Sequence, residues 1–242
     1  MADTTSSIEL GFIGFGNMAQ AMAQGLVDSG ALSGEHIHAC AGRFDKLQAT
    51  AEKLGVNAYR EAAEVVETSD FVVLAVKPYL IEQVVEPVRE LLADKAVISV
   101  AAGRDFAFYE GVLAPNSRHL STIPNTPIAV GAGVIACEQR HSLTDEELEA
   151  FENLFGRIAL IEWVDGKLLS TASSIAGCGP AFAAMFLESL GDAGVKHGLP
   201  RATAYRLAAQ MMMGTAKLHL ETGTEQRIDI FQEKIAIFKI SQ

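Results

Sequence analysis

Cysteine is scarce in this 242-residue chain, and its three cysteines lie far apart. Cys40, Cys137 and Cys178 form no Cys-x-x-Cys pair, so their spacing suits neither a structural zinc site nor a disulfide framework. The histidines likewise include no His-Glu-x-x-His motif. The sequence therefore predicts no metal centre, and it suits a reducing compartment such as the cytoplasm.

Positive charge and long apolar runs are also in short supply. The chain has 19 Lys and Arg against 30 Asp and Glu, a formal net charge of −11, which argues against nucleic acid as a main partner. The longest apolar runs, such as 71–76 and 128–137, are too short for a membrane span, and residues 1–7 are too polar for a signal peptide. There is also no Walker-type lysine loop and no Gly-x-Ser-x-Gly elbow.

The most informative stretch is a glycine turn near the start of the chain. Residues 8–13 form a short apolar run that predicts a strand, and Gly14-x-Gly16-x-x-Ala19 follows, leading into a helical pattern. A strand, a glycine turn and a helix in this order are the context of a dinucleotide-binding fingerprint. Gly14 would permit the tight turn, and Gly16 would let a pyrophosphate approach the backbone at the helix N-terminus. The alternative is an ordinary strand–helix turn.

After the glycine turn, predicted strands and helices alternate along the chain, and this order predicts an α/β fold. Residues 71–76 form an unbroken apolar run, which is typical of a parallel strand that is buried on both faces. Further strands are expected at 37–40, 96–100, 119–123, 131–137 and 159–163, the last of which closes the sheet. Helices are expected at 44–54, 62–68, 80–92 and after a capping box at 144–147.

The segment after the second strand indicates which cofactor is preferred. A Rossmann domain places an acidic residue there to bind the ribose 2′-hydroxyl of NAD, whereas a cation accommodates the 2′-phosphate of NADP. Here Arg43 occupies the place, with Lys46 one helical turn later and no carboxylate before Asp45. This favours NADP, and the alternative is that Arg43 is a solvated surface charge.

Other candidate contacts follow the later strands. Lys77 and Pro78 end the apolar run, and small residues at 101–103 end the next strand; ligands of open α/β sheets bind at such carboxyl ends. Pro124 and Pro127 restrict the loop between them and forbid helix there, so that Asn125 and Thr126 would be presented rigidly. A purely structural turn remains the alternative for that loop.

From residue 165 the sequence becomes helical. Helices are expected at 167–175, from Pro180 onward and at 202–220, with breaks at 177–180 and 198–200. The last two helices are apolar on several faces, which suggests packing against another subunit. The sequence thus predicts a Rossmann-type dinucleotide-binding domain at 1–164 and an all-helical dimerisation domain at 165–242.

Several of these motifs together resemble the pyrroline-5-carboxylate reductase family. The matching segments are 11–19, 75–78, 99–103, 124–127, 176–181 and 192–201, and the likeness extends over about residues 8–224. The resemblance implies an oxidoreductase that reduces 1-pyrroline-5-carboxylate to L-proline, the last step of proline biosynthesis, with NADP or else NAD. It also implies a cytoplasmic homodimer or a larger assembly of dimers, with a small-molecule substrate.

The resemblance also assigns residues to the site, although it assigns no catalytic side chain. Arg43 and the small residues at 101–103, which were named above from the strand ends, are added to the cofactor residues of the resemblance. The full cofactor-binding set is Ile13, Gly14, Phe15, Gly16, Asn17, Met18, Arg43, Ala75, Val76, Lys77, Pro78, Ala101, Ala102 and Gly103. The substrate-binding set is Asn125, Thr126, Gly177, Cys178, Gly179 and Pro180.

Two departures from the family pattern are visible. Cys178 stands where the family usually has serine, and a nucleophilic role for it is not expected, because hydride transfer to an imine needs no covalent intermediate. Residues 225–242 contain no Ser-Pro-Gly-Gly-Thr-Thr loop, which in the family holds the substrate. Because this tail is rich in isoleucine, we expect it to be ordered and to pack on the dimer helices. Because the substrate loop is missing, we expect the enzyme to turn over 1-pyrroline-5-carboxylate only weakly.

Three alternatives stay open. A 3-hydroxyacid dehydrogenase would need a lysine soon after Gly177, and none occurs before Lys196. The others are an imine reductase with another substrate and a non-catalytic NADP-binding dimer.

Overall fold

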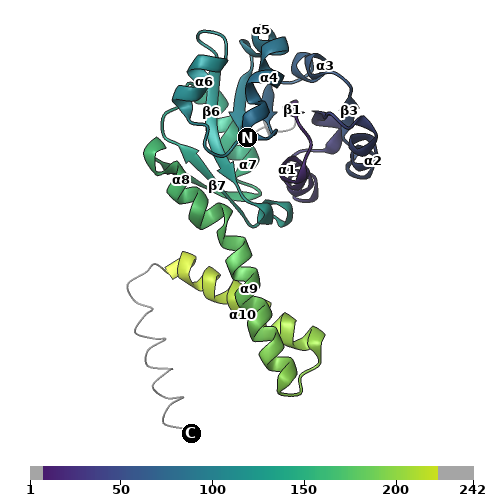
Figure 1. Cartoon of the computed structure of the whole chain (residues 1–242), viewed down its shortest axis with the longest axis vertical. Helices are drawn as coiled ribbons and strands as arrows, with labels where there is room; N and C mark the ends of the chain where they lie inside the picture. Colours follow the sequence, from purple (N-terminus) through teal and green to yellow (C-terminus); the bar gives the residue numbers. More distant parts are fainter. Residues whose placement is uncertain (1–7, 223–242) are drawn as a thin grey trace, which may run out of the picture. The chain divides into compact units, whose positions relative to one another are not determined.

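The computed structural model describes residues 8–222, which form two compact units that divide between Pro180 and Ala181 (Figure 1). Strands end at Val164, where the sequence placed the domain boundary, but the helical residues 165–180 belong to the first unit. The boundary at residue 164 therefore stays a prediction. The tail at 225–242 lies outside the described residues.

The first unit is built on an eight-stranded sheet in the order β3-β2-β1-β4-β5-β6-β7-β8. The first six strands in this order are parallel; β7 is antiparallel to β6, and β8 is parallel to β7. The order 3-2-1-4-5-6 is that of a doubly wound dinucleotide fold, which confirms the predicted α/β class. The strands are β1 (Leu10–Ile13), β2 (Ile37–Cys40), β3 (Asn57–Tyr59), β4 (Phe71–Leu74), β5 (Ala96–Ser99), β6 (Arg118–Pro124), β7 (Gly133–Glu138) and β8 (Ala159–Val164).

Helices cover both faces of this sheet. One core joins it to α1 (Asn17–Asp28), α2 (Phe44–Leu54) and α7 (Asp145–Phe155). The other joins it to α3 (Ala62–Glu67), α4 (Ile81–Val85), α5 (Arg89–Leu92) and α6 (Phe106–Val112). Along β4, Phe71 and Val73 enter the first core, and Val72 and Leu74 enter the second. The apolar run at 71–76 is unbroken because both faces of its strand are buried.

Most predicted elements are present, with two omissions and one interruption. The expected strand 37–40 and helix 44–54 coincide with β2 and α2, and the Thr144–Glu147 capping box opens α7 with reciprocal bonds of 3.2 and 3.0 Å. The expected helix 80–92 is divided into η3 (Pro78–Leu80), α4, η4 (Glu86–Val88) and α5, because Pro87 cannot continue an α-helical ladder. The strand β3 and the helix α6 were not predicted from the sequence.

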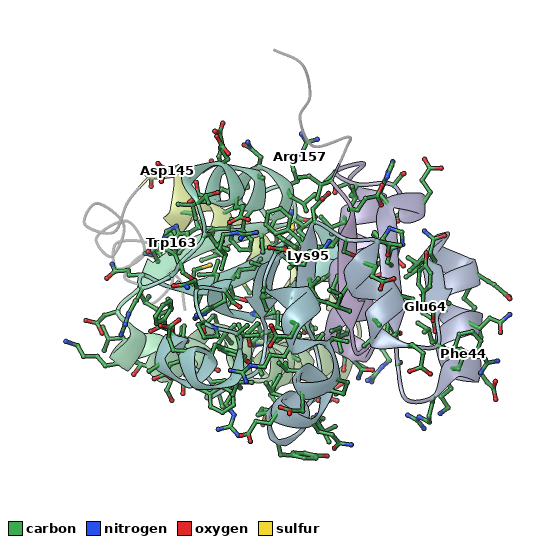
Figure 2. All side chains as sticks on the ribbon, turned by 90° about the horizontal axis from the view of Figure 1, so that it is seen from above. Phe44, Glu64, Lys95, Asp145, Arg157 and Trp163 are labelled. Atoms are coloured by element: carbon green, nitrogen blue, oxygen red, sulfur yellow. The ribbon has the colours of Figure 1, made fainter. Side chains whose placement is uncertain are left out.

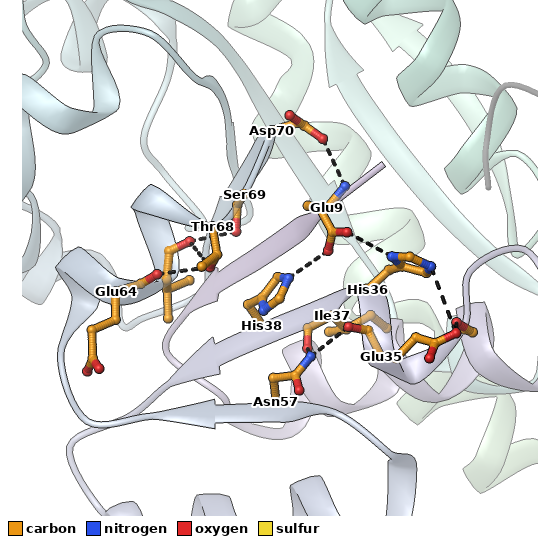
Figure 3. Close-up of polar contacts among 12 residues, drawn as sticks. Glu9, Glu35, His36, Ile37, His38, Asn57, Glu64, Thr68, Ser69 and Asp70 are labelled. Carbon is orange, nitrogen blue, oxygen red and sulfur yellow. Dashed lines mark hydrogen bonds and ion pairs between the residues drawn. The ribbon is translucent and has the colours of Figure 1, made fainter. Parts of the chain in front are cut away.

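A polar cluster joins the amino ends of β1 and β2 (Figure 3). The Glu9 carboxylate bridges His36 Nδ1 at 2.8 Å and His38 Nε2 at 2.7 Å, while the Glu9 backbone N–H donates to Asp70 Oδ2 at 2.9 Å. Burial raises the pKa of Glu9, but the hydrogen bonds and charges of the two histidines outweigh it and lower that pKa below 4.5. This cluster lies at the edge opposite to the carboxyl ends of the strands and stabilises the pairing of β1 with β2.

The predicted break at 177–180 is wrong in form. The chain runs through η6 (Gly166–Leu168), α8 (Leu169–Ala172) and a π-helical turn, η7 (Ser173–Gly177), directly into α9 (Gly179–Lys196). The Cys178 N–H donates to the Ser173 carbonyl at 3.1 Å, which closes the wide turn. Pro180 is tolerated because it stands in the first turn of α9, where backbone N–H groups need no intrahelical partner.

The second unit, as described, comprises the rest of α9 and α10 (Arg201–Thr222). Arg201, Asp192 and Tyr205 tie the two helices together: Arg201 donates to Asp192 at 3.2 Å and to the Tyr205 hydroxyl at 2.8 Å, and that hydroxyl donates to Asp192 at 3.0 Å. Gly191 permits this approach, since a Cβ there would lie 2.5 Å from the Tyr205 ring. The helices break at 198–200, as predicted.

The apolar side chains of these two helices are largely uncovered in the single chain. Phe182, Met185 and Phe186 are 66%, 65% and 56% exposed, and Leu207 and Met213 are 57% and 58% exposed. Within the described residues, the stretch Gly166–Lys196 is also long and apolar enough, by length and composition alone, to cross a membrane, with a mean hydropathy of 1.3 over its qualifying window. The prediction of no membrane span counted only unbroken apolar runs, and Glu188 and Asp192 interrupt this stretch.

Candidate dinucleotide site

The register of the sheet brings the predicted cofactor segments to one edge. Ile13 pairs with Cys40 on one side and Leu74 on the other, and Leu74 pairs with Ser99. Parallel strands in this register end together, so the turns after β1, β2, β4 and β5 leave the sheet side by side. The segments 14–18, 41–43, 75–78 and 101–103 are thereby neighbours, as an open α/β binding crevice requires.

The Gly14 turn is compact and accepts no side chain. Gly14 has a φ of +92°, and a Cβ there would lie 2.6 Å from the Val76 side chain and 2.7 Å from the Ala75 carbonyl oxygen. Its N–H donates to the Cys40 carbonyl at 2.9 Å, which fastens the turn to β2. Gly14 therefore has the structural role in the fingerprint that the sequence predicted.

Gly16 differs because it borders open space. Apart from Gly16 itself and its two chain neighbours, no protein atom lies within 4 Å of the position of a Gly16 Cβ, and this residue is the N-cap of α1 without a side-chain cap. The first-turn N–H groups of α1, including that of the exposed Asn17, therefore have no side-chain acceptor there, and a helix N-terminus favours an anion. Phe15 is buried edge-on against Phe12, so its side chain stabilises the turn from below.

Two of the predicted cofactor residues, Ile13 and Ala101, are buried, and the hydrogen bonds described for them come from their backbone atoms and stay within the protein. Ile13 is 2% exposed, and its carbonyl accepts the Ala75 N–H at 2.9 Å. Ala101 is 3% exposed, and its N–H donates to Ser99 Oγ at 3.2 Å. By contrast, Ala102 and Gly103 are exposed, and Gly103 turns the chain with a φ of +74°.

The turns after β4 and β5 are joined by Arg104, which was not among the site residues predicted from the sequence. Arg104 donates from Nε and Nη2 to the Pro78 carbonyl, each at 3.3 Å, and its guanidinium lies 4.3 Å from the Phe108 ring centroid. Lys77, next to Pro78, is exposed. In the sequence, Arg104 comes directly after Gly103 at the end of a predicted strand, and this position could have indicated its role.

Two buried groups beneath this edge stay protonated at neutral pH. Burial raises the pKa of the Cys40 thiol, and burial raises the pKa of Tyr109 to about 12. The Tyr109 hydroxyl is hydrogen-bonded to Ser99 Oγ. Both side chains lie in the core beneath the strand ends. Because their raised pKa disfavours the ionised form, neither is expected to act as a nucleophile.

Asn125 is buried, and its side chain is already in use. Its Oδ1 accepts the Val134 N–H at 2.8 Å, and its Nδ2 donates to the Ala176 carbonyl at 2.9 Å. The side chain thus fastens the π-turn η7 to β7, while the exposed Thr126 begins η5 (Thr126–Val130), a 3₁₀-helix. The expectation that the two prolines forbid helix is wrong here, because Pro127 fits the first turn of a 3₁₀-helix.

The remaining predicted substrate residues lie at the π-turn and the start of α9. Gly177 and Cys178 are exposed, and Gly179 and Pro180 are half-buried. A hollow of about 340 Å³ elsewhere in the first unit is lined by Glu138, Asp165 and Lys167, among others, and by none of the predicted site residues. The Glu138 carboxylate there accepts the Phe106 N–H at 2.7 Å, and burial raises its pKa.

Two models of known protein families match parts of this chain. A family model described as NADP oxidoreductase coenzyme F420-dependent matches residues 9–103, and one described as pyrroline-5-carboxylate reductase dimerisation matches residues 166–236. The first match covers the glycine turn and the strand ends described above. The second covers η6 through α10, and several apolar side chains of α9 and α10 are exposed in the single chain.

Whole-chain relatives agree. The pyrroline-5-carboxylate reductase of Treponema pallidum is 44% identical over 220 residues, covering 89% of this chain and 83% of the relative. That of Escherichia coli is 34% identical over 216 residues, covering 89% and 80%. The crystal structure of Plasmodium falciparum pyrroline carboxylate reductase with NADP bound aligns with a TM-score of 0.84 at 27% identity, over 96% of this chain and 85% of that one. The predicted resemblance is confirmed: this chain is an oxidoreductase of the pyrroline-5-carboxylate reductase family.

Proposed function

We propose that this chain reduces 1-pyrroline-5-carboxylate to L-proline with NADPH, the last step of proline biosynthesis. The observation that carries the proposal is an intact dinucleotide turn in a chain that belongs to this reductase family over most of its length. A related 3-hydroxyacid dehydrogenase is disfavoured, because no lysine follows Gly177 before Lys196.

The residues at the carboxyl edge fit a dinucleotide phosphate. The pyrophosphate would lie over Gly16 and the first-turn N–H groups of α1, where the protein leaves open space. Lys77 and the small residues 101–103 would line the path toward the nicotinamide, and Arg43 would face the ribose 2′-phosphate. These residues all belong to the predicted cofactor set, and each role can be tested by a single substitution.

The chemistry is a reduction of a ring imine. When bound, the nicotinamide supplies a hydride to the imine carbon, while the ring nitrogen takes up a proton, so that the C=N bond becomes C–N. The task of this chain is to hold the two rings together and exclude competing reactions. The segment 177–180 would contribute to the substrate pocket, and Asn125 would act on it indirectly, by fixing η7 through the Ala176 carbonyl.

The oligomeric state and the location belong to the same proposal. The exposed apolar side chains of α9 and α10 would be covered in a homodimer, or in a larger assembly of dimers. This would also account for the apolar character of Gly166–Lys196 without a membrane, as expected for a cytoplasmic enzyme with a small-molecule substrate and no nucleic-acid partner.

The test is steady-state oxidation of NADPH by the full 242-residue chain with 1-pyrroline-5-carboxylate, together with direct titration of NADPH. Turnover that is saturable in the substrate and lost in Gly16→Val supports the proposal. Normal NADPH binding without turnover would instead identify a non-catalytic NADP-binding protein. Failure to bind either NADPH or NADH would overturn the proposal altogether.

A further inference from the structure

Arg60 is a second cation at the edge where the ribose 2′-phosphate is expected. Strands β2 and β3 are parallel and pair Cys40 with Tyr59, so the chain leaves both strands at the same level. Arg60 directly follows β3, and Arg43 follows β2 by a short turn. Two arginines therefore follow adjacent strand ends at one corner of the sheet.

Phe44 holds Arg60 toward that corner. The guanidinium carbon of Arg60 lies 4.0 Å from the centroid of the Phe44 ring, well within the range of a cation–π contact. Phe44 is the first residue of α2 and immediately follows Arg43, the N-cap of that helix. Figure 2 shows Phe44 at the outer edge of the unit, at the end opposite to Asp145 and Trp163.

Stacking leaves the binding groups of Arg60 free. A guanidinium that lies on an aromatic ring uses its face, whereas its N–H donors point outward in the plane and can still bind an anion in a bidentate manner. Within residues 8–222, neither Arg60 nor Arg43 makes a side-chain hydrogen bond or an ion pair, and both are exposed. In a chain with a net charge of −11, these two arginines give this corner a local concentration of positive charge, which favours an anion.

We propose that Arg60, held on the Phe44 ring, is a second specificity-determining residue for the 2′-phosphate of NADPH beside Arg43. This rests on the proposed function, because it concerns the same cofactor. A phosphate monoester carries about −1.5 to −2 charges at pH 7, so two guanidinium groups match its charge better than one. NADH presents a hydroxyl at that position and gains little from either arginine.

The experiment measures dissociation constants of NADPH, NADH and adenosine 2′,5′-bisphosphate by calorimetry on the full chain. Arg60→Ala is expected to weaken NADPH and adenosine 2′,5′-bisphosphate on the order of tenfold, as for loss of a charge-assisted hydrogen bond, while NADH changes less than about twofold. Phe44→Leu should reproduce part of this loss in the wild-type background and add little to Arg60→Ala. Arg157→Ala removes another exposed arginine, labelled far from Phe44 in Figure 2, and should change none of the three constants.

The outcomes separate this inference from the proposed function. If the wild type binds neither dinucleotide, the proposed function fails. If the wild type binds NADPH but Arg60→Ala leaves its affinity unchanged, or weakens NADH equally, the inference is overturned while the function stands. A folded state of each variant, checked by circular dichroism, ensures that a loss of binding is local.

Discussion

Replacing Asn125 by alanine should destabilise the first unit, because this side chain joins two separate segments. Asn125 is 6% exposed. Its side-chain amide accepts a hydrogen bond from the Val134 N–H at 2.8 Å and donates one to the Ala176 carbonyl at 2.9 Å. Alanine would leave both backbone partners without their bonds in a poorly hydrated place. Each abandoned partner costs about 1–3 kcal/mol, and because both are half-buried, a total of about 2–4 kcal/mol is expected.

The loss is measurable as a shift in thermal unfolding. A change of 1 kcal/mol lowers Tm by about 2–4 °C in a protein of 150–250 residues, so Asn125→Ala should lower it by about 5–15 °C. The assay is thermal unfolding followed by circular dichroism, at one protein concentration and without cofactor. Fixed concentration matters because an assembled protein gains apparent stability by mass action.

A second substitution at Asn125 separates the two bonds, and a substitution at Thr126 serves as the control. Asn125→Asp keeps an acceptor for the Val134 N–H but sets a second oxygen against the Ala176 carbonyl, so it should also destabilise the π-turn. Thr126→Ala changes an exposed neighbour and should stay within about 0.5 kcal/mol of the wild type. If Asn125→Ala is as stable as Thr126→Ala, the two bonds do not support the fold, and the reasoning is refuted.

Three other predictions concern the site, the pH dependence and the assembly. Gly16→Val should abolish NADPH binding in a titration while leaving the circular dichroism unchanged; a variant that still binds would show that the turn is only structural. Because the folded state lowers the pKa of Glu9 below 4.5, its contribution to stability is present above pH 4.5 and lost as the pH falls through the lowered pKa. The Tm difference between wild type and Glu9→Gln should therefore shrink on acidification below pH 4.5, and a constant difference would contradict this assignment. Phe186→Asp places a charge among the exposed apolar side chains of α9 and should reduce the molar mass of the assembly in light scattering, whereas a wild type that is already monomeric would refute the interface.

The local sequence was sufficient wherever one segment determines its own conformation. The apolar pattern of 37–40 predicted β2, and the helical pattern of 44–54, ended by Gly55, predicted α2. The Thr144–Glu147 pair predicted the start of α7, and Gly14 predicted the turn after β1. These features depend on side-chain period, capping and backbone sterics, which act within a few residues. For the same reason, the glycine turn could be interpreted as a candidate dinucleotide site before the fold was known.

Features that depend on distant partners were decided by the tertiary structure. Strand β3 is short and only half-buried, so it carries no apolar run, and nothing in the sequence indicated that Arg60 follows a strand next to β2. Asn125 looked free in a rigid loop, but β7 and the π-turn occupy both ends of its amide, since a buried amide must find partners. The break expected at 177–180 became a π-turn, because that wide turn keeps the chain helical into α9 while exposing its backbone to Asn125. The sequence alone thus determined the turn and the class of fold, while long-range pairing decided which side chains remain free to bind and which hold the structure together.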